Sequence, residues 1–181
     1  MTSGRRTGQL HLNRVSGSDT VYFVTCCTHW RISRLLEPEI AAAIHTSVRQ
    51  SDAIRDTATF AFTIMPDHCH WVFRLGARLS LGRIVARFKA DTRKVLAPRR
   101  AEWQRDFYEH RLLHGEQPED YAFYVFLNPY RAGLIRPDEA WPHWWTAIPE
   151  ALRFVSLLNP NGSPQTEWIG EAVPPSVRHG E

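Results

Sequence analysis

The chain of 181 residues has room for one domain of ordinary size with a hydrophobic core, and too little for two. Hydrophobic residues make up 43% and charged residues 23%, proportions that exclude a disordered middle. It contains no apolar run long enough for a membrane span, and residues 1–14 are polar and basic rather than apolar like a signal peptide. We therefore expect a cytoplasmic protein with no membrane partner.

The formal net charge of +3 permits a nucleic-acid partner without requiring one. Arginine supplies most of the positive charge, and its planar fork suits phosphate groups and stacked bases. Cys26 and Cys27 are neighbours and Cys69 stands alone, which is neither a disulfide framework nor a CxxC metal site. Free thiols are expected.

The first half of the chain predicts three strands and a helix. Residues Thr20 to Thr28 are rich in β-branched and aromatic side chains, as in a central strand. A helix is expected from Glu37 to about Asp52, where apolar residues recur at helical spacing. Thr57 to Met65 and His68 to Leu75 have the pattern of two strands joined by a tight turn at Pro66-Asp67.

The second half predicts two helices around a short strand. Ser80 can cap an amphipathic, basic helix, and Phe107 to Leu113 is a strand candidate. Glu119 to Leu127 forms a further helix begun near Pro118, which the Asn128-Pro129 step should end or bend. The order β-α-β-β-α-β and a helix predicts an α+β, ferredoxin-like split βαβ fold. Its antiparallel sheet has helices on one face and leaves the other face for a ligand. The last helix is expected near this second face.

Three segments are expected in the chain as a whole. Residues 1–18 form a basic N-terminal arm, and 19–150 form the folded domain. Residues 151–181 are rich in Pro, Gly and Ser, and we expect a poorly ordered tail there.

Two histidines stand two positions apart on the strand that begins at His68. Side chains at that spacing point to one face of a sheet, so His68 and His70 project together while Cys69 points to the opposite face. Two adjacent imidazoles are half of a metal site. Short patterns also recur by accident, so the pair alone leaves open that the histidines merely decorate a sheet face.

Three stretches of sequence carry a family resemblance. They are Thr63-Ile-Met-Pro-Asp-His-Cys-His-Trp-Val-Phe73, Trp103-Gln-Arg-Asp-Phe-Tyr-Glu-His110 and Tyr124-Val-Phe-Leu-Asn-Pro-Tyr-Arg-Ala-Gly-Leu134. The first resembles the His-hydrophobe-His signature of the HUH single-strand DNA nucleases. The ordered set is similar to the REP-associated tyrosine transposases, relatives of the one-tyrosine transposases of insertion sequences. Cys69 departs from the pattern, because the family usually has a larger hydrophobe between the histidines.

The resemblance implies a role for each matching residue. It makes Tyr124 the nucleophile and His68, His70 and Asn128 the metal ligands of a single-stranded DNA endonuclease and strand-transferase. The product would be a 5′-phosphotyrosine link, and the target would be DNA hairpins like REP palindromes. Independently of the family, residues four apart share a helix face, so Tyr124 and Asn128 can look at the same sheet. Other tyrosines compete for the role of nucleophile: Tyr108, Tyr121 and Tyr130.

Ligand chemistry and charge indicate the cofactor and the substrate contacts. Imidazole, carboxamide and phosphate ligands together suit Mg²⁺ or Mn²⁺, and the sequence does not separate the two. As a group, seven cations are expected to contact DNA phosphates: Arg74, Arg78, Arg83, Arg87, Lys89, Arg93 and Lys94. Unpaired bases could stack on Trp30, Trp71 or Trp103, although tryptophans are more often core residues.

Two other functions fit the same residues. A non-catalytic protein or repressor that binds structured DNA would keep the fold without forming a covalent product. A metal-dependent hydrolase would use water as its nucleophile, but the sequence lacks the extra Asp and His ligands typical of such enzymes. The protein could be a monomer or a homodimer.

Overall fold

A computed structural model describes residues 20–171 and 174. The basic arm expected at residues 1–18 and the last residues of the tail lie outside the described residues. In the described part, the main elements are β1 (Val21–Cys27), α1 (Pro38–Ala53), β2 (Thr57–Ile64), β3 (His68–Leu75), α2 (Leu81–Leu96), β4 (Tyr108–Arg111), α3 (Pro118–Arg131) and β5 (Trp144–Trp145). Their order confirms the predicted β-α-β-β-α-β pattern followed by a helix.

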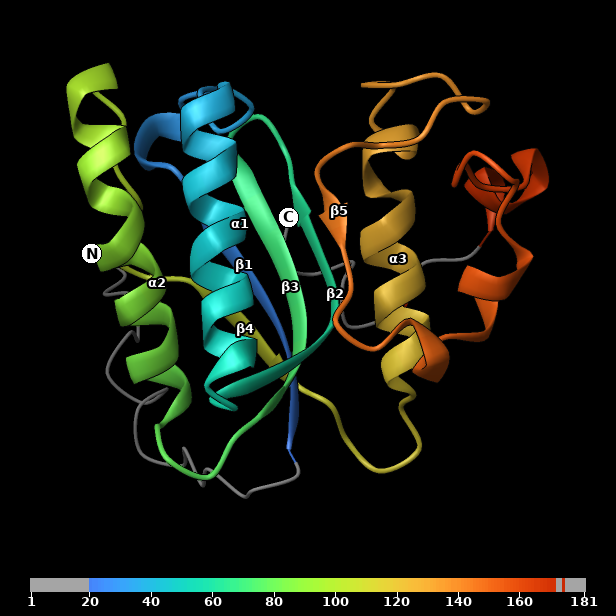
Figure 1. The fold of residues 1–181 in the computed structure, drawn as a ribbon, viewed down its shortest axis with the longest axis horizontal. Coiled ribbons are helices and arrows are strands. Elements are labelled where there is room, and N and C mark those ends of the chain that lie inside the picture. The colour runs from blue at the N-terminus through green and yellow to red at the C-terminus, as the bar shows by residue number, and fades with distance from the viewer. Residues whose placement is uncertain (1–19, 172–173, 175–181) are drawn as a thin grey trace, which may run out of the picture.

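The strands form one five-stranded sheet in the order β4-β1-β3-β2-β5, with antiparallel pairing throughout. Helices α1 and α2 cover one face of the sheet and α3 covers the other (Figure 1). This arrangement confirms the α+β, ferredoxin-like prediction, including the position of the last helix. The strand β5 is an addition that the sequence did not predict; it pairs with the edge of β2 through Trp145 and Phe62.

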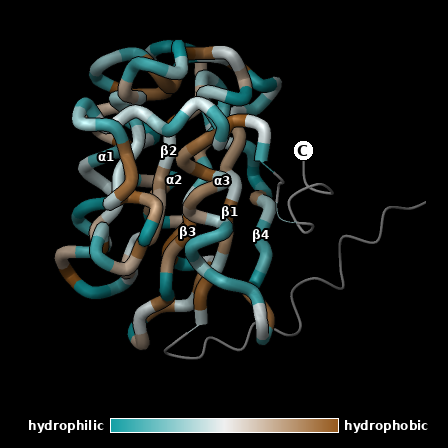
Figure 2. Tube along the Cα trace, turned by 90° about the vertical axis from the view of Figure 1, so that its right-hand side faces the viewer, coloured by the Kyte–Doolittle hydropathy of each residue, from teal (hydrophilic) through white to brown (hydrophobic). Residues whose placement is uncertain are grey.

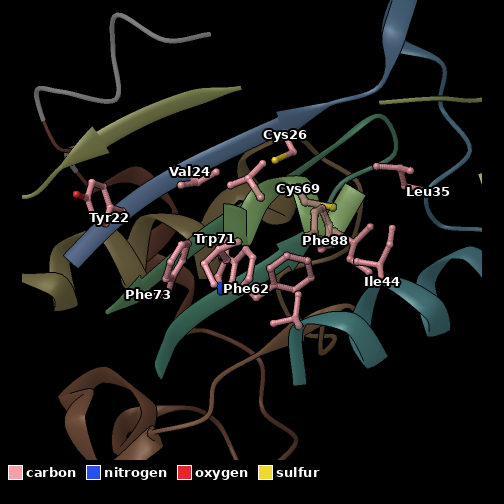
Figure 3. Packing of buried hydrophobic residues seen from close by; sticks show 14 of the residues in the cluster. Tyr22, Val24, Cys26, Leu35, Ile44, Phe62, Cys69, Trp71, Phe73 and Phe88 are labelled. Carbon is pink, nitrogen blue, oxygen red and sulfur yellow. The ribbon is translucent and has the colours of Figure 1, made fainter. Parts of the chain in front are cut away.

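Strict alternation along the central strands divides the core into two layers. Cys69, Trp71 and Phe73 of β3 are buried under α1 and α2, in the cluster that Figure 3 shows. The intervening Val72 belongs to a second cluster, which is built around α3. Cys69 therefore points away from the histidine face, as predicted, and burial raises the pKa of its thiol well above 9.0. It is a core residue and not a metal ligand.

Helix α3 is longer than the sequence predicted. Pro118 occupies its first turn, where the missing N–H costs nothing, and the helix continues through Pro129 to Arg131. A proline in the last turn removes only one intrahelical bond, and the helix then ends at Gly133, whose φ of +67° suits glycine. Much of α3 is hydrophobic where it lies across the sheet (Figure 2). Asn128 consequently stays in helical geometry, one turn after Tyr124.

The segment after the domain is also more regular than expected. Residues Pro149–Ala151, Arg153–Leu157 and Thr166–Gly170 form short 3-10 helices on the outer side of α3 (Figure 1). The reason is apolar packing: the ring of Phe154 is 5.3 Å from that of Phe126 and is only 6% exposed. A Pro- and Gly-rich composition thus did not prevent order up to residue 171. No helix in the described part of the chain is long and apolar enough to cross a membrane.

Candidate active site

The histidine pair lies at the start of β3, on the face covered by α3. The Nε2 atoms of His68 and His70 are 3.1 Å apart. The Nδ1 atom of His68 donates a hydrogen bond of 2.7 Å to the carboxylate of Asp67, and Nδ1 of His70 is 2.9 Å from the hydroxyl of Thr25. The two Nε2 atoms face each other within hydrogen-bonding distance, and a ligand bound by both would take the place of that contact.

The spacing of the two Nε2 atoms fits a shared metal ion. Two nitrogen ligands at about 2.1 Å from one ion, at an angle of roughly 90–110°, lie about 3.0–3.4 Å apart. The observed separation of 3.1 Å between His68 and His70 falls in that interval. No group of three or more His, Cys, Asp or Glu side chains within the described residues could hold a metal. An ion here would need further ligands of another kind, such as an amide, a DNA phosphate or water.

The chemical state of His70 also suits a ligand. Its side chain is buried, with only 1% of the residue exposed. Burial, assisted by the neighbouring His68 and Arg31, holds the pKa of His70 well below 6.5. The imidazole is therefore neutral at physiological pH, which is the form that binds metals.

Tyr124 and Asn128 approach this pair from α3. The ring of Tyr124 is 5.7 Å from that of His70, and the amide nitrogen of Asn128 donates a hydrogen bond of 2.9 Å to the Tyr124 hydroxyl. Phe23 of β1 fills the space between helix and sheet, stacked on His70 and edge-on to Tyr124. The fold thus brings together the four residues that the sequence singled out, although Tyr124 lies more than fifty residues after His70 in the chain.

Comparison with known proteins decides the family. The family model described as "Transposase IS200 like" matches residues 17–115, more than half of the chain. The chain belongs to the IS200-like transposase family. This membership gives the protein a transposase-like function in DNA transposition. The matched range contains His68 and His70 and ends before α3.

Solved structures add support for the fold. A REP-associated tyrosine transposase bound to a REP hairpin superposes with a TM-score of 0.65 at 18% identity, covering 95% of each chain. A protein from Deinococcus radiodurans described as a transposase has a TM-score of 0.45 at 15% identity, covering 63% of this chain and 88% of its own. No curated protein sequence matches the chain. The first likeness shows that this IS200-like transposase has the fold of a REP-associated one.

The candidate site has supporting residues that the sequence did not predict. Asp67 bridges His68 and Arg31, whose Nε lies 2.8 Å from the other carboxylate oxygen. Asp67 could have been found, since a carboxylate beside a candidate ligand is a usual orienting group. Thr25 could not, because its position depends on the pairing of β1 with β3, in which it faces His70. The sequence also did not predict Arg131, whose guanidinium lies 5.9 Å from the centre of the Tyr124 ring.

The seven cations predicted to contact DNA do not form one surface with this site. Arg74 continues the histidine face of β3 and lies over Phe60 at 5.6 Å. The five on α2 are carried by a helix on the other face of the sheet: Arg83, Arg87, Lys89, Arg93 and Lys94. Two of these five have partners within the fold.

The first is Arg87, which, like Arg78, pairs with the fully buried carboxylate of Asp56. The second is Lys89, whose ammonium donates to three successive backbone carbonyls, at residues 104–106. Burial lowers the pKa of Lys89. The side chains of Arg87 and Lys89 therefore stabilise the fold, in addition to any contact with DNA.

The competing tyrosines are engaged elsewhere. The hydroxyl of Tyr121 donates to the carboxylate of Glu116 at 2.6 Å, and that of Tyr130 donates to the carbonyl of Glu139 at 3.0 Å. Tyr108 lies on the edge strand β4, edge-on to Phe23. Among these tyrosines, only Tyr124 combines a ring contact with His70 and a hydrogen bond from Asn128.

Proposed function

We propose that this transposase is a metal-dependent endonuclease and strand-transferase for single-stranded DNA, with Tyr124 as its nucleophile. The observation that carries the proposal is the meeting of His68 and His70 with Tyr124 under α3. Their Nε2 atoms converge, and the phenol ring lies beside them.

The proposed reaction exchanges one phosphodiester bond for another. The Tyr124 oxygen attacks the scissile phosphorus as the bond from phosphorus to the 3′-oxygen breaks. The phenol loses its proton and the departing 3′-oxygen gains one, so the step needs no net acid or base. The product is a 5′-phosphotyrosine link and a free 3′-hydroxyl. Because the link keeps a phosphodiester, a second 3′-hydroxyl can attack it and rejoin DNA without an external energy source.

Each of the assembled side chains has a distinct task in this proposal. His68 and His70 would hold a divalent ion, with the amide oxygen of Asn128 as a third ligand. The amide nitrogen of Asn128 positions the Tyr124 hydroxyl. Asp67 and Thr25 fix the two imidazole rings, whose Nε2 atoms would hold the ion.

A divalent ion held by these residues would offset the weakness of a phenol as a nucleophile. A phenol has a pKa of about 10 and is a weak nucleophile at neutral pH, so the phosphate must be made receptive. A bound divalent ion withdraws charge from the non-bridging phosphate oxygens and stabilises the transition state. Mixed nitrogen and oxygen ligands favour Mn²⁺, while the phosphate and amide oxygens also suit Mg²⁺.

We further propose that the substrate is single-stranded DNA that carries a hairpin. The likeness in fold to a transposase that is bound to a REP hairpin supports this choice. Arg74 is exposed on the histidine face and would contact phosphates near the site, while the exposed cations of α2 lie on the other face and would contact phosphates farther along the DNA.

The test is incubation of the purified protein with labelled hairpin oligonucleotides and Mn²⁺, followed by denaturing electrophoresis. A labelled band at the mass of the protein is expected. It should disappear in Tyr124→Phe and in His68→Ala. Tyr121→Phe is the matched control, because it alters a neighbouring buried tyrosine and should leave the adduct in place. Binding without an adduct in the wild type would instead favour a non-catalytic DNA-binding protein.

A further inference from the structure

Trp30 is the most exposed large hydrophobic side chain in the described part of the chain. Its exposed fraction is 82%, whereas Trp71 lies in the core and Trp103 is partly buried against it. Trp71 is 2% exposed and donates to Thr59, and Trp103 donates to Thr92 at 2.8 Å. An indole left in solvent forgoes apolar burial, so its place calls for an explanation.

The backbone that carries Trp30 is held in a sparsely populated conformation. Trp30 and Arg31 have successive φ angles of +56° and +53°, in the left-handed region that bulky residues avoid. Such outliers persist only where surrounding contacts impose them, and they concentrate at functional sites. The turn is fixed on either side, since the backbone N–H of His29 donates to Glu102 and the hydroxyl of Thr28 donates to Ile32.

The same turn is tied to the histidine pair. The guanidinium of Arg31 binds one oxygen of Asp67 at 2.8 Å, and the other oxygen accepts the hydrogen bond from His68. The backbone N–H of Thr28 donates to the carbonyl of Asp67 at 2.8 Å. Trp30 is therefore linked to the proposed metal ligand His68 through its neighbour Arg31 and through Asp67.

We infer that Trp30 is a stacking platform for one unpaired DNA base next to the scissile phosphate. This inference rests on the proposed function and adds to it the residue that holds the single strand in register. The indole gives a base a flat apolar face, and stacking of this kind tolerates any base. The strained turn keeps the ring extended into solvent, and Arg31 couples it to Asp67. The platform is thus held at a fixed position relative to the His68 imidazole.

The test compares Trp30→Ala, Trp30→Phe and Leu157→Ala with the wild type. Leu157 is a matched control because it is another exposed hydrophobic residue, 59% exposed, on the outer side of α3. Binding to a fluorescent hairpin is measured without divalent metal, once with a single-stranded extension and once with blunt ends. Trp30→Ala should weaken binding to the extended hairpin by about tenfold or more and leave the blunt one unchanged. Trp30→Phe should stay within about threefold of the wild type, and Leu157→Ala should have no effect.

Abasic substitutions then identify the stacked base. One abasic position in the extension should cost the wild type about the same factor, and it should cost Trp30→Ala nothing further. Equal affinities of the wild type and Trp30→Ala for every oligonucleotide would overturn the inference, while the Tyr124 adduct would still stand. Failure of the wild type to bind DNA would overturn both. Because the side chain is exposed, the variants should fold, which thermal unfolding can check.

Discussion

The side-chain amide of Asn128 donates a hydrogen bond of 2.9 Å to the hydroxyl of Tyr124, one helical turn earlier on α3. The bond exists because α3 does not end at Asn128 but continues through Pro129. It fixes the phenol relative to the helix. In the proposed mechanism the two residues thus form one unit, in which the proposed ion ligand Asn128 also orients the proposed nucleophile Tyr124.

Asn128→Ala should slow adduct formation strongly while it changes the free energy of unfolding only slightly. We expect the rate of adduct formation to fall by about 100-fold or more, because both an ion ligand and the hydrogen bond to Tyr124 are lost. The free energy of unfolding should fall by only about 1 kcal/mol, as for one hydrogen bond. Single-turnover adduct assays and urea unfolding measure the two quantities. Asn128→Asp, which keeps an oxygen ligand, should retain more activity; an Asn128→Ala protein as fast as the wild type would contradict the assignment.

Asp67→Ala should weaken metal binding without removing a ligand. Asp67 accepts the Nδ1 proton of His68, and loss of such a partner costs about 10- to 100-fold in metal affinity. A titration of adduct formation with Mn²⁺ should therefore shift to higher concentration by that factor. Asp67→Asn keeps an acceptor and should shift less, and Thr25→Val tests the equivalent partner of His70. Identical Mn²⁺ curves for all of these proteins would show that the histidines need no such support.

Arg87→Ala should act on stability more than on DNA. Its guanidinium lies 2.7 Å from Asp56, whose carboxylate is fully buried, so truncation leaves a buried charge with only the exposed Arg78 beside it. Breaking such a pair costs about 3 kcal/mol. Urea unfolding should show this loss, while Arg83→Ala on the exposed side of α2 should leave stability unchanged. If Arg87→Ala were as stable as the wild type, the role of Arg87 would be DNA contact and not support of the fold.

The sequence was sufficient for the elements whose pattern is repeated along several residues. Alternation on β3 predicted that His68 and His70 share a face and that Cys69 lies in the core, because a strand has a period of two. Helical spacing predicted that Tyr124 and Asn128 face the same way. Each of these inferences needs only local geometry.

The remainder depends on contacts between distant segments. The strand β5 has two residues, and it is a strand only because Trp144 and Trp145 pair with β2. The regular tail depends on the packing of Phe154 under Phe126, which a Pro- and Gly-rich composition conceals. The acidic partner of Arg87 comes from a loop about thirty residues earlier in the chain. A basic helix face could therefore be recognised in the sequence, but not which of its cations the fold itself uses.

His45 should make the protein less stable in mild acid. Burial, with contributions from Arg49 and His143, lowers the pKa of His45 to about 4, and its ring nitrogens have no hydrogen-bond partner among the described residues. In the unfolded chain the pKa is about 6.5, so between these values the unfolded state binds a proton that the folded state does not. The stabilisation is fully present above pH 6.5 and is lost as the pH falls toward 4.

The expected loss between pH 7 and pH 4.5 is about 2 kcal/mol, reduced from the full linkage value because His45 is partly exposed. His45→Leu keeps an apolar group against Phe62, which the ring contacts edge-on at 5.9 Å, and removes the titrating one. Other histidines and carboxylates titrate in the same interval, so the informative quantity is the difference between the two proteins. Urea unfolding should give His45→Leu a smaller acid loss than the wild type by that amount. If the unfolding free energies of the two proteins fell in parallel with pH, the pKa of His45 would be the same in the folded and the unfolded state.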